Sequence, residues 1–516
     1  MKHGNKNSHG KFLEQEISLK FLCKKKKSVK HAETKKKRIA ILPIIYTIVV
    51  LLFMFAVFHA YRNAFMGGLP AGSEGYYHER IANAIEKKGI LSYDSLSFSG
   101  RTYIFSTYDY LLALAGKVTG VRAASIWIPL AMAIISVFAF YGIMRKSGMK
   151  ENSINITLLI LVATPAFAYS ALTSNPQIAA AAFLLSAFYF YMREEKFAFA
   201  LSAIFFGFAA LAGVASFIIS LSMAGFYTIK HPERKKRFFA ILGIFALMLL
   251  TYIIMTVRVG LPPISFGKSL SSIVLELGAI SGIGIFELII AGMGLIYAWG
   301  SKDMNYLPIS MAALLLLLFL FGMNVSVYLA FACAFFSSLA INFLDERKWS
   351  LGIMRGASII LILCGLLFSG LTFMGRAVKM EPDPGTIGAF SWLSNNYSGG
   401  NVLSVPKNGF YIEYFGMKAF SDDHFEYAPN LEQRLNASQQ IFYSRDLDKT
   451  MAELAKNNIT YIVITPEMKN GLVWRKEQEG LLFLLRNNET FKNVYLESTQ
   501  AGEIEIWKVV PQPMAG

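Results

Sequence analysis

Long apolar segments alternate with short polar ones between residues 39 and 374. Several of these segments reach the ~18–20 residues that a helix needs to cross a bilayer. Only 16% of the residues are charged, whereas a soluble domain has roughly 25%. The pattern therefore predicts an α-helical polytopic membrane protein with about 11 transmembrane helices.

The positions of the apolar runs define the expected spans. The run 197–229 is too long for one crossing, so we expect two short spans there with a turn near Gly213. The other spans are expected at 39–58, 123–144, 153–172, 177–192, 238–257, 281–299, 307–322, 324–344 and 353–374.

The distribution of basic residues predicts the orientation. The formal net charge is +16, and much of it lies in the tail 1–38. We interpret this tail as a cytoplasmic flank that attracts anionic lipid rather than nucleic acid. Basic clusters at 145–150, 230–237 and 345–348 fall on the same side as the tail in this count of spans. A cytoplasmic N-terminus and an external C-terminus follow from the positive-inside rule. A single chain of this architecture with a lysine-rich tail suggests a multi-pass protein of an archaeal or bacterial plasma membrane.

The chain divides into three parts. After the tail 1–38, residues 39–375 form the membrane domain, with a long first external loop at 59–122. From residue 376 the composition becomes that of a soluble domain, and helical segments alternate with β-rich ones. The segment 376–516 is therefore expected to be an external α/β domain. Its helices are expected at 385–396, 446–457 and 478–487, and its strands at 402–405, 459–464, 491–497 and 503–510.

The first external loop carries the densest polar cluster, between Gly72 and Gly89. We expect a helix from about Tyr76 that lies along the membrane interface and ends at Gly89. Glu74 precedes this helix, where its carboxylate could accept a proton or bind a metal ion. Alternatively, Glu74 is a solvated acid that the helix dipole favours.

Residues 72–120 resemble the first external loop of the oligosaccharyltransferase catalytic subunit and its relatives in the C-type glycosyltransferase superfamily. The resemblance rests on Glu74-Gly-Tyr-Tyr-His-Glu-Arg80, where an acid precedes an aromatic pair and an interfacial helix. A second match is Ser272-Ile-Val-Leu-Glu276, which looks like a short external motif of that family. The resemblance implies the C-type glycosyltransferase fold and sugar transfer from a polyprenyl-phosphate donor on the outer face of the membrane.

The resemblance also implies roles for individual residues. Catalysis would involve Glu74, Glu276 and His78, with Glu74 as a ligand to a divalent cation, Mg²⁺ or Mn²⁺. Substrate binding is assigned to Tyr76, Tyr77, Arg80 and Arg258. The expected partners are membrane lipid, the lipid-linked sugar, and an acceptor protein or glycan, with no nucleic acid.

The sequence departs from the family at three places. The segment Ser174-Asn-Pro-Gln177 has no carboxylate where the family has its second acidic motif. Val405-Pro-Lys-Asn-Gly409 stands where the family has WWDYG, the motif that reads the hydroxyl residue of the acceptor sequon, and keeps only its glycine. Val325-Ser-Val-Tyr328 has no arginine where the family uses one to bind the lipid phosphate. One carboxylate is a poor site for a hard cation. These differences favour metal-independent transfer of a single sugar, as in the related protein mannosyltransferases.

Other interpretations stay open at this stage. A catalytically inactive relative that binds surface glycans or a protein partner is the main alternative, and a transporter is a weaker one. Glu287 lies inside an apolar span, where an acid indicates function; it would pair with Arg258 or face a polar cavity. Asp422-Asp-His424 reads as a polar turn more readily than as a metal pair.

Overall fold

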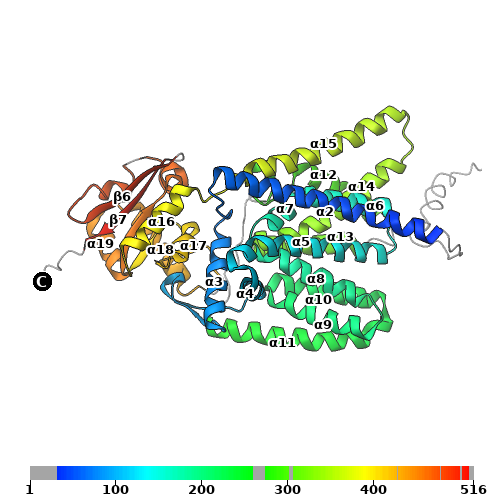
Figure 1. Ribbon diagram of the computed structural model, residues 1–516, viewed down its shortest axis with the longest axis horizontal. Helices are drawn as coiled ribbons and strands as arrows, with labels where there is room; N and C mark the ends of the chain where they lie inside the picture. The colour runs from blue at the N-terminus through cyan, green and yellow to red at the C-terminus, as the bar shows by residue number, and fades with distance from the viewer. Residues whose placement is uncertain are drawn as a thin grey trace, which may run out of the picture.

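The computed structural model describes residues 32–259, 273–300, 306–426, 428–476, 478–499 and 502–510. A helical bundle forms one part of the molecule and an α/β domain the other (Figure 1). Helices α3 (Glu74–Lys88) and α4 (Thr107–Thr119) lie between them, and in Figure 1 α3 runs across the direction of the long bundle helices.

Within the described ranges, five bundle helices are long and apolar enough to cross a membrane. Two more helices, α6 (Glu151–Ala163) and α7 (Pro165–Leu172), are long and apolar enough only when taken together, and the pair bends by 63° at Thr164. The bend has a local cause, because the residue before a proline is pushed out of the helical region. Thr164 accordingly has φ −69° and ψ 122°. The five long helices are α2 (Ala32–Phe65), α5 (Val121–Lys146), α11 (Lys235–Val259), α14 (Ser326–Glu346) and α15 (Gly352–Ala377).

Shorter apolar helices occupy the remaining predicted spans. The long run 197–229 is divided into two helices at Gly213, as its length predicted. Gly213 has φ 155°, a conformation that favours glycine. The predicted helical membrane architecture is therefore confirmed. The shorter helices are α8 (Pro176–Tyr191), α9 (Lys196–Leu211), α10 (Val214–Lys230), α12 (Ile285–Trp299) and α13 (Tyr306–Phe321).

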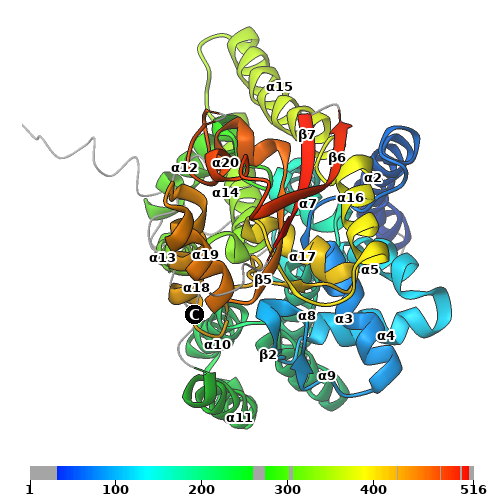
Figure 2. The same cartoon turned by 90° about the vertical axis from the view of Figure 1, so that its left-hand side faces the viewer.

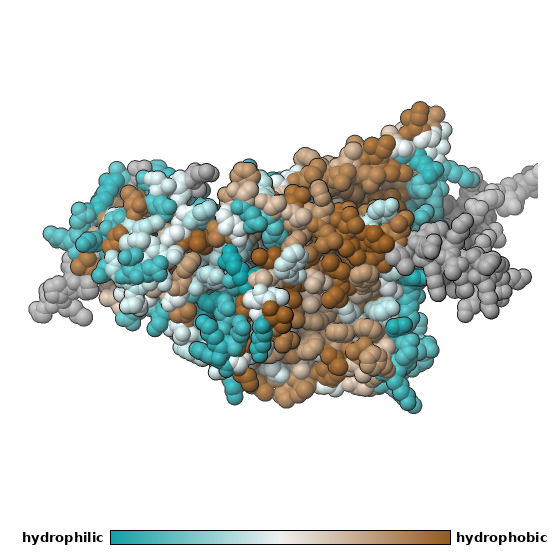
Figure 3. Space-filling model, in the orientation of Figure 1, coloured by the Kyte–Doolittle hydropathy of each residue, from teal (hydrophilic) through white to brown (hydrophobic). Residues whose placement is uncertain are grey.

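The bundle surface is an apolar belt with hydrophilic residues on both sides of it (Figure 3). Helices α15 and α11 lie on opposite sides of the bundle (Figure 2). Both expose large apolar side chains, such as Leu361 and Leu371 on α15 and Leu247 and Leu250 on α11. A surface of this extent is not tolerated in water, so lipid must cover it.

The basic clusters gather at one end of the bundle. Lys146 and Arg234 both donate to backbone carbonyls of the segment after α8, Lys146 to that of Met192. Lys150 pairs with Glu346 at the end of α14, with Nζ and Oε1 2.9 Å apart. In Figure 3 a hydrophilic fringe marks this end, opposite the α/β domain.

The α/β domain is built on a five-stranded sheet of order β4-β3-β5-β7-β6. Strand β3 pairs in parallel with β4 and β5, and β7 pairs antiparallel with β5 and β6. The strands are β3 (Asn401–Leu403), β4 (Lys418–Ala419), β5 (Ile459–Ile464), β6 (Phe491–Thr499) and β7 (Gly502–Val509).

Helices cover the sheet of this domain and close its core. Trp474 is fully buried there, and its indole N–H donates to the carbonyl of Phe442 at 2.8 Å. The sequence predicted the first and fourth of these helices; it missed α17 and α18, and the helix expected at 478–487 is only one turn. The helices are α16 (Pro384–Asn396), α17 (Pro406–Tyr414), α18 (Leu431–Tyr443), α19 (Leu447–Lys456) and α20 (Leu481–Leu484).

One buried arginine joins the bundle to the α/β domain. Arg62, in the last turn of α2, donates to the carbonyls of Leu69 at 2.7 Å and Pro70 at 3.1 Å. It also donates to the carbonyls of Met380 at 2.7 Å and Val378 at 3.3 Å, just before the α/β domain. The guanidinium thus joins the segment that follows α2 to the segment that follows α15.

Replacing Arg62 with methionine should destabilise the protein by about 3 kcal/mol, because several buried carbonyls lose a charged donor. The unfolding temperature of the protein in detergent should fall by several degrees. The control is Arg145→Met, since Arg145 is exposed and its nearest acid, Glu151, is 3.9 Å away. An unchanged unfolding temperature for the Arg62 variant would contradict this role.

Candidate active site

Glu74 begins α3, and its side chain is exposed at the junction of bundle and loop. The segment after α7 lies directly against it. The amide nitrogen of Asn175 is 3.4 Å from Glu74 Oε2 and donates to it, and the amide oxygen of Asn175 accepts from the backbone N–H of Gln177 at 2.8 Å. The segment Ser174-Asn-Pro-Gln177, which the resemblance matched to the family's second acidic motif, therefore lies beside Glu74 and contributes an amide there.

Neutral polar side chains continue from this point into the bundle. The side-chain oxygen of Gln177 accepts a hydrogen bond from Ser326 at 3.2 Å. Two residues further along α14, the hydroxyls of Tyr328 and Ser216 are 2.7 Å apart. These groups are hydroxyls and amides, in the region where the resemblance led us to look for an arginine that binds the lipid phosphate.

The polar side chains around Glu74 do not suit a divalent cation. In the part of the chain that the structure describes, no three His, Cys, Asp or Glu side chains are grouped closely enough to hold a metal ion. The amide oxygen of Asn175 is already used to cap α8. Mg²⁺ and Mn²⁺ prefer several oxygen ligands, so one carboxylate is a poor fit.

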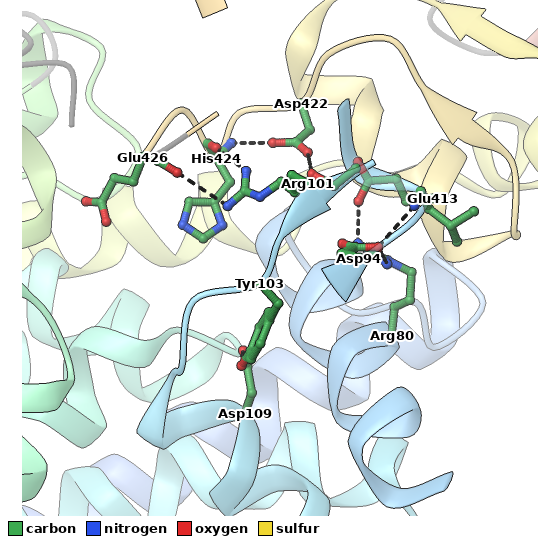
Figure 4. A network of polar contacts seen from close by, with 11 residues as sticks. Arg80, Asp94, Arg101, Tyr103, Asp109, Glu413, Asp422, His424 and Glu426 are labelled. Carbon is green, nitrogen blue, oxygen red and sulfur yellow. Dashed lines mark hydrogen bonds and ion pairs between the residues drawn. The ribbon is translucent and has the colours of Figure 1, made fainter. Parts of the chain in front are cut away.

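His78 lies one helical turn after Glu74 and therefore on the same side of α3. Its Nδ1 is 2.6 Å from Asp109 Oδ1. The hydroxyl of Tyr103, which lies next to Asp109 in Figure 4, donates to the other oxygen of Asp109 at 2.8 Å. Burial, together with the charge of Asp109, raises the pKa of Tyr103, which keeps the phenol protonated as a donor. Asp109 comes from the first turn of α4.

Tyr108 connects His78 to the segment beside Glu74. Its ring meets the imidazole edge-on, with the centroids 5.1 Å apart, and its hydroxyl is 2.9 Å from that of Ser174. Ser174 is the neighbour of Asn175, which contacts Glu74. The structure thus places Glu74 and His78 on the same side of α3, next to α4 and to Ser174 and Asn175.

Arg80 binds two carboxylates of the protein itself. Its guanidinium donates to both oxygens of Asp94, at 2.8 and 2.7 Å, and to Glu413 Oε2 at 2.6 Å (Figure 4). Glu413 belongs to α17, so these bonds cross from the loop to the α/β domain. Burial and the neighbouring Asp422 raise the pKa of Glu413 well above its usual range, although Arg80 opposes the shift. The substrate role that the sequence assigned to Arg80 stays a prediction.

The hairpin of strands β1 (Tyr93–Asp94) and β2 (Arg101–Thr102) adds further bonds to this junction. Ser97 donates to Asp422, and Arg101 donates to the carbonyl of His424 at 2.7 Å (Figure 4). Asp422 Oδ1 also accepts from the backbone N–H of His424 at 2.7 Å. Asp422-Asp-His424 is thus a turn closed by its own aspartate, which was the favoured interpretation of these residues.

The two tyrosines predicted to bind substrate are buried between α3 and α17. Tyr76 lies between the rings of Tyr411 and Tyr414, with centroids 5.1 and 5.0 Å away. Tyr77 packs against Phe410 at 5.1 Å. Both rings therefore hold the loop to the domain, and their predicted contact with substrate is untested.

The remaining predicted residues lie elsewhere. Glu276 caps α12, because its carboxylate accepts from the backbone N–H of Ile285 at 2.8 Å and from Ser369 at 2.6 Å. Arg258 is exposed near the end of α11, and the loop that follows it, 260–272, lies outside the described residues. Glu287 is buried and accepts from Thr164 at 2.8 Å, at the bend between α6 and α7.

The side chains that bind His78 and Arg80 could not be predicted from the sequence. Asp109 binds His78, and Asp94 and Glu413 both bind Arg80. Tyr103 in turn donates to Asp109. The only local signal was at Asp109, which lies three residues after Ser106, the N-cap of α4. The others are joined to α3 by contacts that no sequence spacing reveals.

This fold is that of the C-type glycosyltransferases, which confirms the fold implied by the resemblance. The archaeal oligosaccharyltransferase AglB from Archaeoglobus fulgidus, in complex with an inhibitory peptide and a dolichol-phosphate, matches with a TM-score of 0.60 and 13% identity over 92% of this chain and 75% of that chain. The apo form of that enzyme matches with a TM-score of 0.61 and 15% identity over 89% and 74%. ArnT from Cupriavidus metallidurans bound to undecaprenyl phosphate matches with a TM-score of 0.52 and 12% identity over 91% and 99%. No protein-family model and no curated protein sequence matches the chain.

The raised pKa of Glu413 predicts a pH-dependent stability. A buried glutamate of this kind is tolerated as the neutral acid below about pH 4.3, its unfolded pKa, and this contribution is lost as the pH rises through the higher folded pKa. Glu413→Gln has no such titration. Its unfolding temperature, relative to that of the wild type, should therefore increase between about pH 5 and pH 9.

The matched control for this measurement is Glu489→Gln, an exposed glutamate of the same domain. Its difference from the wild type should not change with pH. A Glu413→Gln variant whose difference from the wild type is equally flat would show that Glu413 is ionised in the folded protein.

Proposed function

We propose that this protein transfers a single sugar from a polyprenyl-phosphate donor to an acceptor on the outer face of the membrane. The observation that carries the proposal is the position of Glu74. It is an exposed carboxylate at the junction of bundle and loop, next to a row of neutral polar groups that leads into the bundle. The fold supports the same class of reaction, because ArnT is matched over nearly its whole length and its structure holds undecaprenyl phosphate.

Glu74 would act as the general base. Its carboxylate accepts the proton of the acceptor hydroxyl, and the acceptor oxygen then bonds to the anomeric carbon of the sugar. The bond between that carbon and the phosphate oxygen breaks, and its electron pair stays on the phosphate. Gln177 and Ser326 would bind the phosphate, and His78 would donate to the leaving oxygen. Glu276, as the cap of α12, would hold the neighbouring loop in place.

The poor fit of a metal ion beside Glu74 favours a lipid monophosphate over a lipid diphosphate as the donor. A lipid diphosphate leaves with more negative charge than a lipid monophosphate, and that charge needs a cation to stabilise it. Asn175, Gln177 and Ser326, the described polar side chains that lead from Glu74 into the bundle, are neutral. We therefore propose a polyprenyl monophosphate carrying one sugar, with a protein or glycan hydroxyl as the acceptor.

The α/β domain does not support recognition of an asparagine sequon. Asn408, in the segment that aligns with WWDYG, is buried, and its amide donates to Ser404 at 2.9 Å. Lys407 is paired with Glu381 at 2.6 Å and Glu467 at 3.0 Å. These side chains are already bonded within the domain. This observation favours, as a second candidate, a relative without transferase activity whose domain binds a partner.

We place the α/β domain and the loop outside the cell and the basic end of the bundle inside. This orientation follows from the positive-inside rule applied to clusters that lie together at one end of the bundle. The assignment of residues 1–38 to a cytoplasmic tail, 39–375 to the membrane domain and 376–516 to the external domain is part of the same proposal.

The test is transfer of a labelled sugar from polyprenyl monophosphate in lipid vesicles. Glu74→Gln should lower the rate by at least about 100-fold, the usual contribution of a general base. Glu86→Gln is the matched control, because Glu86 is an exposed acid on the same helix, and its rate should equal that of the wild type. Equal transfer by wild type and Glu74→Gln would remove Glu74 from the mechanism. No transfer by the wild type would favour the partner-binding candidate.

A further inference from the structure

Asp109 is a buried acid in the first turn of α4 with an arrangement that its own helix does not need. Its carboxylate is fully enclosed, and both oxygens accept hydrogen bonds from side chains outside α4: His78 Nδ1 at 2.6 Å and the Tyr103 hydroxyl at 2.8 Å. Burying a carboxylate is costly unless such bonds compensate it. One of the two compensating bonds, the bond to His78, also keeps the imidazole ring in place.

The bond to Asp109 determines the state of the His78 ring. A carboxylate only accepts, so the proton of this bond lies on Nδ1, and Nε2 is then at the opposite edge of the ring. Among the described residues Nε2 has no hydrogen-bond partner, and the His78 side chain keeps 9% of its accessible surface. A ring held at one nitrogen with the other nitrogen free is the arrangement by which an aspartate orients a catalytic histidine.

The position of His78 relates this pair to the reaction. His78 follows Glu74 by one helical turn, and Tyr108 links its ring to Ser174 in the segment beside Glu74. The imidazole and the proposed base are therefore on the same side of α3. The two groups come from one rigid helix, so their separation is fixed.

We propose that Asp109 is a positioning residue that holds His78 as the proton donor to the leaving phosphate, an inference that rests on the proposed function. As the bond between the anomeric carbon and the phosphate oxygen breaks, the proton on Nε2 passes to that oxygen. Glu74 takes the proton of the acceptor hydroxyl, so the products are the glycosylated acceptor and the protonated lipid phosphate. Asp109 keeps its bond to Nδ1 throughout, and Tyr103 holds the second oxygen of Asp109.

The negative charge of Asp109 has a second effect, because a neighbouring carboxylate favours an imidazole that holds the proton to be donated. Other charged or titratable groups near the ring are the same in wild type and Asp109 variants, so a change in pH dependence reports on Asp109. These groups are Glu74, Tyr77, Arg101, Tyr103, Tyr108 and His424.

The experiment compares Asp109→Asn with the wild type in the full-length protein, with polyprenyl monophosphate carrying a labelled sugar as the donor. Asparagine keeps the shape of the side chain but removes its charge. The maximal transfer rate should fall by about 10- to 100-fold while the KM for the lipid donor stays within about twofold. The limb of the pH profile at high pH should move to lower pH, because the carboxylate charge beside the proton donor is gone.

Two further variants keep the proposal falsifiable if Asp109→Asn folds poorly. Tyr103→Phe removes only the second bond to Asp109 and should lower the rate about fivefold, the worth of one hydrogen bond. Asp109→Glu restores the charge and should recover part of the rate. Glu86→Gln again serves as the matched control.

The outcomes separate this proposal from the one it rests on. If the wild type transfers sugar and Asp109→Asn does so at the same rate and with the same pH profile, Asp109 does not position a proton donor. A folded Asp109→Asn that raises only the KM for the donor would also overturn the proposal. Absence of transfer by the wild type would overturn the proposed function itself.

Discussion

The burial of Arg80 with Asp94 and Glu413 is the interaction on which the rest of this structure depends. A charged side chain can leave water only with well-placed partners, and removing one partner leaves a costly unpaired charge. Asp94 belongs to the same loop as Arg80, but Glu413 belongs to the α/β domain. The loop and the domain must therefore close on each other for either to be stable, and α3 is fixed between them.

This constraint explains why so much of the polar motif on α3 faces inward. Tyr76, Tyr77, Glu79 and Arg80 all contact the domain, Glu79 through the hydroxyl of Tyr414 at 2.8 Å. Burial raises the pKa of Glu79, and that hydrogen bond opposes the shift. Glu74 is the first residue of α3, and its side chain is exposed. The rigid attachment of the rest of α3 is what holds its carboxylate in one position.

The bundle supplies the other half of the arrangement through the bend at Thr164. Because α7 changes direction by 63° there, its end brings Ser174 and Asn175 against the start of α3. Asn175 contributes a donor where a carboxylate would contribute a ligand. The surface around Glu74 is consequently suited to hydrogen bonding and proton transfer and poorly suited to a divalent cation.

The sequence predicted the membrane helices well, because apolar length and basic flanks are local properties of the chain. It also predicted the short pair around Gly213 and the helix that ends at Gly89. It could not show that Arg80 meets Glu413, 333 residues away, or that His78 meets Asp109, since these contacts depend on how helices pack. Helix α17 was not predicted, because Val405–Gly409 was matched to a recognition motif of the family, although Pro406 is a favourable first residue of a helix.

The most direct test of the account is to find where the lipid phosphate binds. A polyprenyl phosphate with a photoreactive group next to its phosphate can be cross-linked to the wild-type protein in vesicles, and the labelled peptides identified by mass spectrometry. The account predicts labelling of peptides that contain residues 74–78 and 174–177, reduced by an excess of unlabelled polyprenyl phosphate. Competed labelling confined to other segments would contradict it.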